Sequence, residues 1–224
     1  MAREHKIMEQ YYKTYLERFK EPPKNFLEIG SRDALHAEIV QKLADIPDNK
    51  MFIVEPHPES FKQIVKNFPQ YRSFELAISN QPGVIKFNAI PATVFPDHIV
   101  GTSSILSADT EFISKYWGAP HPINWINVLA INGAQLLRLI NEPEIDLVKI
   151  DVEGFTWEVL ISFGDAIRAM KSIHIEVEWL PVWKDQHVYA EVKHLLEFYN
   201  FKEMYYIPLY LGGNQGDAVW IRND

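Results

Sequence analysis

Acidic residues stand at the ends of several apolar, strand-like runs of this 224-residue chain. Glu28 lies near the end of "NFLEIG", and Glu55 lies near the end of "KMFIVEP". Asp151 and Glu153 come at the end of "EIDLVKIDVEG". Ligands of an open, parallel sheet bind just beyond the carboxyl ends of its strands. If these runs share one sheet, the sequence predicts a row of carboxylates along a single ligand-binding edge.

The turn after the first run has the features of a cofactor site. Gly30 lets the backbone turn sharply and come close to a ligand, and a helix-like pattern follows. Glu55 comes after Gly30 at an interval close to the ~20 residues at which an acid commonly binds ribose hydroxyls. Glu28 and Asp33 put two carboxylates around the turn. Like charges repel, so the turn favours a cationic ligand such as S-adenosylmethionine over a pyrophosphate.

Each of these features has a plainer explanation. Strand–Gly–helix turns occur in many α/β proteins, and a carboxylate that ends a strand often caps a helix or is simply solvated. The order Glu28, Gly30, Glu55, Asp151 along alternating strands is more specific than any single residue. A nicotinamide dehydrogenase is a rival from another class. The chain lacks the G-x-G-x-x-G loop of such enzymes at this turn, and the acids around Gly30 also count against one.

The acids near the fourth run could remove a proton from an alcohol. Asp151 and Glu153 are two residues apart, so both point to the same side of a strand, and each raises the proton affinity of the other. Glu176 and Glu178 repeat the spacing one strand further on. A divalent cation held by these acids is an alternative, as is a helix-capping role for Glu153. We interpret Asp151, Glu153 and Glu178 as the catalytic residues and predict no metal; His98 and His121 are alternative bases.

Strand-like and helix-like patterns alternate along most of the chain. Helices are expected at residues 4–20, 34–44, 58–67, 133–140, 155–169 and 187–199, and strands at 25–30, 50–56, 71–79, 84–90, 125–131, 144–154, 172–179, 201–208 and 216–223. The segment 84–90 follows a turn and alternates like a hairpin partner of 71–79. This order predicts a doubly wound α/β sheet, mostly parallel, with one antiparallel strand near the C-terminus.

The chain reads as a single domain, because no linker or repeat divides it. Residues 1–23 are expected to form a helical extension, and the irregular segment 91–124 to form a lid or substrate loop. The formal net charge of −8 argues against nucleic-acid or anionic-membrane partners, and the lack of cysteine excludes disulfides and thiolate chemistry. No apolar run approaches the ~20 residues that span a bilayer, and the charged N-terminus lacks a signal-peptide core. We therefore expect a cytoplasmic protein.

Six segments together resemble the FkbM family of S-adenosylmethionine-dependent methyltransferases. They are, in order, "FLEIGSRDA", "MFIVEPHPESF", "LAISNQPGVIKF", "GTSSI", "INVLAINGAQLL" and "DLVKIDVEGFTWEVLISF". The resemblance implies the class I methyltransferase fold, which is Rossmann-like and has a seven-stranded sheet with an antiparallel C-terminal strand. It also implies methylation of oxygen, often on a saccharide. The alternative is a protein of this fold that binds S-adenosylmethionine but is inactive, or that acts on nitrogen or on a protein.

The resemblance also implies a set of cofactor-binding positions. They are Glu28, Gly30, Ser31, Asp33, Glu55, Pro56, Ala77, Ile78, Ser104 and Asp151. Among them, Glu55 would bind the ribose, and Ala77 and Ile78 would touch the adenine. The sequence departs from the family at Arg32, where a second Gly or an Asn is usual. The acceptor is expected to be a small molecule or saccharide that the sequence does not identify.

Overall fold

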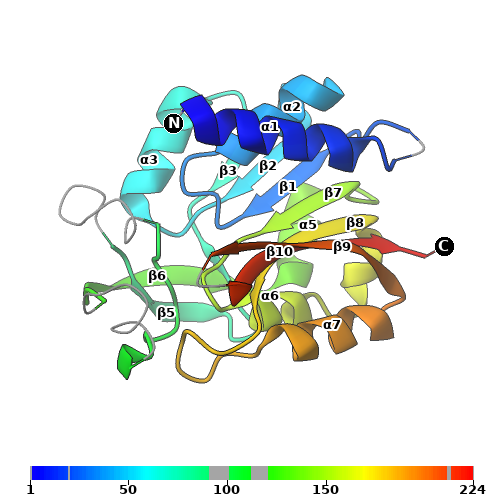
Figure 1. Ribbon diagram of the computed structural model, residues 1–224. Helices are drawn as coiled ribbons and strands as arrows, with labels where there is room; N and C mark the ends of the chain where they lie inside the picture. The colour runs from blue at the N-terminus through cyan, green and yellow to red at the C-terminus, as the bar shows by residue number, and fades with distance from the viewer. Residues whose placement is uncertain (1, 20, 91–100, 112–120, 211–212, 224) are drawn as a thin grey trace.

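The computed structural model describes residues 2–19, 21–90, 101–111, 121–210 and 213–223. A seven-stranded sheet passes through the middle of this part of the chain, in the order β3-β2-β1-β7-β8-β10-β9 (Figure 1). Its strands are β1 (Phe26–Ile29), β2 (Met51–Val54), β3 (Arg72–Phe74), β7 (Leu147–Ile150), β8 (Ser172–Glu178), β9 (Phe201–Tyr210) and β10 (Gln215–Arg222). The last strand, β10, is antiparallel to both of its neighbours. The predicted fold class is therefore confirmed.

Helices cover both faces of this sheet (Figure 1). One layer contains α1 (Ala2–Leu16), α2 (Leu35–Ala44) and α3 (Pro58–Asn67), and the other contains α5 (Gly133–Ile140), α6 (Thr156–Phe163) and α7 (Tyr189–Phe198). Short 3₁₀ helices occupy Asp48–Lys50 and Gly164–Ala169. The expected helix over 155–169 thus changes to a 3₁₀ helix at Gly164, where the backbone has a positive φ of 52°.

Every residue of β1, β2 and β7 is buried, because helices lie against both faces of the sheet. Side chains that alternate along these strands enter two separate clusters. Leu27, for example, packs with the layer of α5, α6 and α7, whereas its neighbour Phe26 packs with the layer of α1 and α2. This explains why these strands read as continuous apolar runs in the sequence.

The N-terminal helix α1 contributes to the core. Tyr12 and Tyr15 are fully buried, and the Tyr15 hydroxyl contacts the hydroxyl of Ser172 on β8. The Tyr12 hydroxyl lies 2.9 Å from Nδ1 of His36 and 3.2 Å from Nδ1 of His174. The predicted extension is therefore a packed part of the α/β structure, and its helix ends at Leu16 rather than at residue 20.

A second, three-stranded sheet corrects the sequence analysis. Residues 71–79 form two strands, β3 in the main sheet and β4 (Ala77–Ile78) in the small sheet, whose order is β4-β6-β5. The strand β5 (Gly83–Asn88) pairs antiparallel with β6 (Trp125–Ile131), not with the strand before its turn. The hairpin prediction was wrong because β6 inserts between the two sequence neighbours, β4 and β5.

The segment predicted as a lid, 91–124, is described only in part. Residues 91–100 and 112–120 lie outside the described residues, so the lid remains a prediction. Within the described part, the backbone of Ser104 exchanges hydrogen bonds with Asn88 at the end of β5. No helix in the described ranges is long and apolar enough to cross a membrane.

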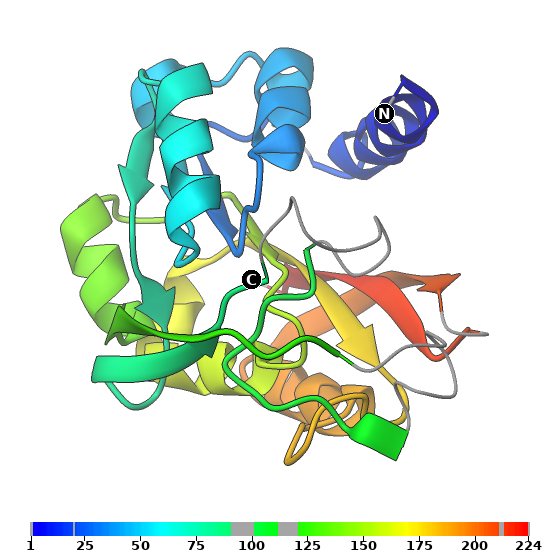
Figure 2. The ribbon, with the colours of Figure 1, turned by 90° about the vertical axis from the view of Figure 1, so that its left-hand side faces the viewer.

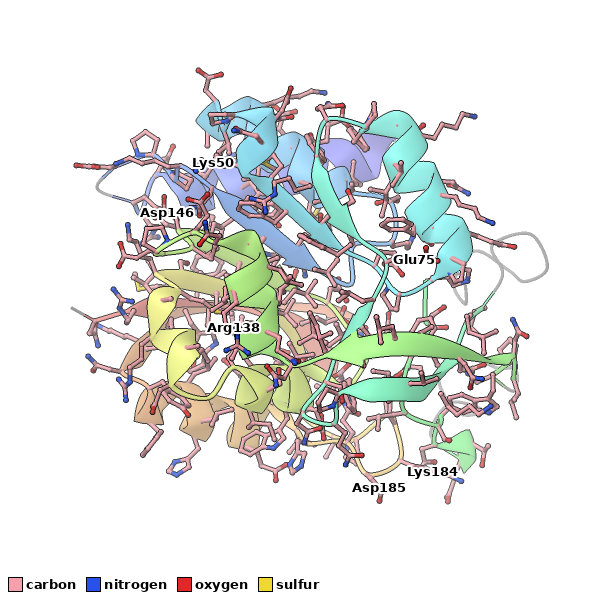
Figure 3. All side chains as sticks on the ribbon, turned by 180° about the vertical axis from the view of Figure 1, so that it is seen from behind. Lys50, Glu75, Arg138, Asp146, Lys184 and Asp185 are labelled. Carbon is pink, nitrogen blue, oxygen red and sulfur yellow. The ribbon has the colours of Figure 1, made fainter. Side chains whose placement is uncertain are left out.

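The two ends of the parallel strands lie on opposite sides of the molecule. In Figure 3, Lys50 and Asp146 mark the side where β2 and β7 begin, and Glu75 lies on the other side, where β3 ends. Figure 2 turns this second side toward the viewer and shows the small sheet and α3 beside it. The predicted row of carboxylates belongs to this second side, where the parallel strands end.

Candidate active site

The carboxyl ends of β1, β2 and β7 open into a cavity of about 240 Å³. Its lining includes most of the predicted cofactor residues: Gly30, Asp33, Glu55, Pro56, Ala77, Ile78 and Asp151. The predicted catalytic residue Glu153 also lines it, together with apolar side chains from the two sheets. Residues that are distant in the sequence therefore meet in a single cavity, as the alternation of strands and helices predicted.

Gly30 is required by the close approach of two chain segments. Its φ is 79°, a conformation that side chains disfavour. A Cβ at this position would collide with the backbone carbonyl of Asp151. The backbone N–H of Gly30 donates to the carbonyl of Val54, at 2.9 Å. Gly30 thus brings the ends of β1, β2 and β7 together at the base of the cavity.

Glu55 stands at the end of β2 with both carboxylate oxygens occupied. Oε2 accepts a hydrogen bond from the backbone N–H of Arg32, and Oε1 accepts one from that of His57, each at 2.7 Å. Burial raises the pKa of Glu55 to about 7, although the two N–H donors oppose the shift. A carboxylate has about four acceptor positions, so Glu55 keeps the capacity to accept further hydrogen bonds from a ligand.

Two predicted cofactor residues lie behind the cavity wall. Glu28 is 1% exposed, and burial raises its pKa to about 8. Ser31 donates its hydroxyl to Glu28 at 3.0 Å and accepts the backbone N–H of Ala34 at 3.1 Å. Neither side chain lines the cavity. Both brace the turn between β1 and α2 from inside.

Ser104 also supports the site from outside the cavity lining. Its hydroxyl donates to the backbone carbonyl of Glu153 at 2.7 Å and accepts the N–H of Leu106 at 3.0 Å. The adjacent Ser103 does line the cavity, and its hydroxyl accepts the N–H of Ile90 at 2.9 Å. Of the serine pair, Ser103 is therefore the one that lines the cavity.

Asp151, Glu153 and Glu176 form what we call the acidic cluster. One carboxylate oxygen from each lies within 4.8 Å of the others, a spacing that could hold a cation. Burial is the main cause of a raised pKa for Glu153 and for Glu176, and the neighbouring carboxylates raise both further. Glu153 and Glu176 therefore hold protons more tightly than isolated carboxylates do.

Glu178, which the sequence analysis assigned to catalysis, lies outside the cavity lining. Its Oε2 accepts a hydrogen bond from Nε2 of Gln186 at 2.5 Å, and its Oε1 faces Nε2 of Gln215 at 3.4 Å. Burial raises its pKa to about 7. Glu176, two residues earlier on β8, is the member of the pair that joins the acidic cluster, and a catalytic role for Glu178 stays a prediction.

A buried lysine that the sequence analysis did not single out lies beside the acidic cluster. Nζ of Lys149 is 3.3 Å from Oδ2 of Asp151 and 3.3 Å from Oδ1 of Asp217 on β10. Nε2 of His174 is 3.2 Å from the other oxygen of Asp217. Although burial alone would lower it, the pKa of Lys149 is raised by these carboxylates. The position of a lysine within the apolar run "DLVKI" was the signal that could have revealed these buried ion pairs of Lys149.

His121, the first alternative base, lies outside the cavity lining. It is 9% exposed, with Nε2 3.0 Å from the hydroxyl of Thr102 and Nδ1 3.3 Å from Nδ2 of Asn88. It packs beside the small sheet and does not line the cavity. Its contacts with Thr102 and Asn88 keep the ring away from the cavity, and its role as a base stays a prediction. The other candidate, His98, lies outside the described residues.

The match to a protein family agrees with this architecture. The sequence pattern of the methyltransferase FkbM domain matches residues 28–203. The chain belongs to the FkbM methyltransferase family. The resemblance inferred from the sequence is thus confirmed. The match extends from β1 into β9, leaving helix α1 and strand β10 outside it.

Individual relatives are more distant. Hexuronic acid methyltransferase AglP of Haloferax volcanii is 23% identical over 154 residues, which cover 67% of this chain and 54% of AglP. The chain thus spans about half the length of this curated relative. Magnesium protoporphyrin IX methyltransferase ChlM from Synechocystis PCC 6803, solved with bound SAM, has a TM-score of 0.52 at 7% identity, covering 98% of this chain and 80% of that chain.

The METTL16 methyltransferase domain gives a similar result. Its TM-score is 0.51 at 9% identity, over 95% of this chain and 65% of that chain. At such identities, these two structures support the fold alone. They agree with the strand order of the main sheet in assigning the FkbM chain to the class I methyltransferase fold.

Proposed function

We propose that this protein is an S-adenosylmethionine-dependent O-methyltransferase that acts on a hydroxyl of a small molecule or saccharide. The observation that carries the proposal is the single cavity in which Gly30, Glu55 and Asp151 meet at the ends of three adjacent strands. Family membership supports methyl transfer as the reaction.

The lining of the cavity fits a cationic methyl donor. Five carboxylic acids line it: Asp33, Glu55, Glu59, Asp151 and Glu153. This acidic lining attracts a sulfonium and an ammonium group. The side chains of Val54, Leu76, Ile78, Phe87 and Phe155 add apolar surface suited to a flat base. The residues present therefore fit S-adenosylmethionine in both charge and apolar character.

The positions of the lining residues support a role for each of them. Glu55 would accept hydrogen bonds from the ribose hydroxyls, and Ala77 and Ile78 would border the adenine. Gly30 leaves room for the amino-acid portion close to the backbone. S-Adenosylmethionine, when bound, supplies an already activated methyl group. The chain must therefore align the acceptor hydroxyl and remove its proton.

Glu153 is the proposed base for that proton. It lines the cavity, and its pKa is raised by burial and by the neighbouring Asp151. A base works best when its pKa approaches the operating pH, and an ordinary carboxylate is too weak for an alcohol. Asp151 lies beside it with Lys149 as a counter-ion at 3.3 Å, and would orient the hydroxyl.

The acceptor class is inferred from relatives of the chain. AglP, the relative described above, is named for its action on a hexuronic acid. The resemblance of this chain to its family likewise implies oxygen as the methylated atom, often on a sugar. We therefore infer a saccharide, with other small hydroxyl compounds as the broader class.

Calorimetry with S-adenosylhomocysteine provides the test. The wild-type protein should bind it, and Glu55→Ala should bind it at least ~100-fold more weakly, because charged hydrogen-bond partners contribute ~1.5–3 kcal/mol each. Glu75→Ala is the matched control, since Glu75 is an exposed acid near the end of β3 that does not line the cavity (Figure 3). Equal affinity of wild type and Glu55→Ala would refute the ribose assignment.

Activity requires a separate assay. The protein should transfer a labelled methyl group to at least one member of a panel of neutral sugars, uronic acids and their glycosides. Binding of S-adenosylhomocysteine without transfer to any hydroxyl compound would instead support an inactive or differently directed member of the fold.

A further inference from the structure

Arg32 is the single Lys or Arg that lines the cavity in the described part of the chain. The five acids named above surround the same space. One positive group at the surface of such an acidic cavity needs an explanation. The proposed methyl donor provides an explanation, because it carries a negatively charged carboxylate as well as its two positive groups.

The side chain of Arg32 has a defined place but few partners. Its only ion pair among the described residues is a long one, with Nε 3.8 Å from Oδ2 of Asp33. Its guanidinium makes no hydrogen bond to any other described residue. It packs on the backbone of Gly101, where a Cβ would come within 2.8 Å of Nη1 and 3.2 Å of Cδ. Within the described ranges, the guanidinium donors thus remain available to a ligand.

The backbone around Arg32 directs it to one part of the site. Arg32 has a φ of 56°, so this residue adopts the left-handed conformation suited to the Gly or Asn usual in the family. Its N–H donates to Glu55. Burial, Asp151 and Glu178 raise the pKa of Glu153, and the charge of Arg32 opposes them. Arg32 therefore lies between the ribose-binding acid and the acidic cluster, where the amino-acid portion of the donor would extend.

We propose that the guanidinium of Arg32 binds the carboxylate of the methionyl group of the methyl donor. This inference rests on the proposed function. Without Arg32, that carboxylate would enter a cavity lined by like charges. A guanidinium presents parallel N–H donors that match both oxygens of a carboxylate. Arg32 thus makes the acidic cavity accept a ligand that is cationic at one point and anionic at another.

The test compares ligands that differ only in this carboxylate. Binding of S-adenosylmethionine and of its decarboxylated analogue is measured by calorimetry for wild type and for Arg32→Gln. Because the Arg32 side chain is 57% exposed, solvent weakens the pair, and we expect the lower end of the range for charged hydrogen bonds. Arg32→Gln should bind S-adenosylmethionine about tenfold more weakly, or ~1.4 kcal/mol, and should bind the decarboxylated analogue as wild type does.

Arg138→Gln is the matched control for charge. Arg138 lies exposed on α5, away from the cavity lining (Figure 3). Its substitution removes the same single positive charge as Arg32→Gln does. Its affinity for both ligands should be unchanged. Thermal unfolding of Arg32→Gln, monitored by circular dichroism, verifies that the variant is folded.

Three results would overturn the inference. An unchanged affinity of Arg32→Gln for S-adenosylmethionine would show that the guanidinium does not hold the carboxylate, and would leave an anionic acceptor as its partner. An equal loss for both ligands would mean that Arg32 only shapes the turn. If wild type binds neither ligand, the proposed function fails and this inference fails with it.

Discussion

Lys149→Met removes the buried cation beneath the acidic cluster and should destabilise the protein strongly. Lys149 is 2% exposed and pairs with Asp151 and Asp217 at 3.3 Å each. Removing one partner of a buried ion pair typically costs ~3–5 kcal/mol, because the other charge stays buried. Asp151 is 31% exposed and can be hydrated, and Asp217 keeps His174, so we expect the lower end, about 3 kcal/mol.

Urea unfolding at pH 7, followed by circular dichroism, measures this loss. Lys171→Met is the matched control, because the Lys171 side chain is 45% exposed and pairs with the equally exposed Glu144. Its second partner, Asp146, is buried but also accepts the backbone N–H of Lys24. Exposed pairs contribute ~0–1 kcal/mol, so the control should remain close to wild type. The double variant Lys149→Met/Asp217→Asn should recover at least ~1 kcal/mol, since it no longer buries an unpaired carboxylate.

The pH dependence of stability provides a second test of the ion pair between Lys149 and Asp217. Burial alone would raise the pKa of Asp217, but Lys149 and His174 lower it well below its ordinary value. A depressed pKa contributes stability above the unfolded value, near 3.9, and that stability is lost as the pH falls. The difference between wild type and Lys149→Met should therefore shrink as the pH is lowered from about 5 to about 3. If Lys149→Met lowers the free energy of unfolding by less than ~1 kcal/mol at pH 7, this account of the ion pair is refuted. The same holds if the double variant is no more stable than Lys149→Met.

Four further predictions concern the cavity. Gly30→Ala should lower the free energy of unfolding by roughly 2–4 kcal/mol and abolish binding of S-adenosylhomocysteine, because a Cβ there collides with the Asp151 carbonyl. A variant that binds this ligand with wild-type affinity in calorimetry would contradict this. Affinity for S-adenosylhomocysteine should rise roughly tenfold from pH 6 to pH 8, because Glu55, with a pKa of about 7, accepts ligand hydrogen bonds best when ionised; Glu55→Gln should flatten the profile. Asp151→Asn should keep ligand affinity within about threefold of wild type but lose methyl transfer, and turnover at the wild-type rate would remove Asp151 from the mechanism. Since no metal is predicted, EDTA should leave turnover unchanged, whereas a loss that Mg²⁺ restores would indicate a cation in the acidic cluster.

Much of the site was readable from local patterns. A glycine after an apolar strand predicts a close turn, and the structure places the Gly30 backbone against Asp151. Acids at the ends of strands predict a shared edge once the strands alternate with helices, because right-handed crossovers leave all carboxyl ends on one side. Gly30, Glu55 and Asp151 were therefore expected to meet, and all three line one cavity.

Pairing between distant strands was not readable in this way. The turn before β5 is a strong local signal, yet β5 pairs with β6, some forty residues later in the chain. Local turn residues determine only where the chain reverses, whereas the burial available on each side determines which strand becomes the neighbour. The division of residues 71–79 between two sheets has the same cause.

The sequence by itself determined the alternation of strands and helices along the chain, the glycine turn and the acids at the strand ends, because each depends on residues close together in the chain. Only the tertiary structure decided which of these acids come together. Glu176 joins the acidic cluster whereas Glu178 bonds to Gln186, and Lys149 finds its second partner on β10. These contacts join residues far apart in sequence, and burial in a low-dielectric interior is what makes their charges interact strongly.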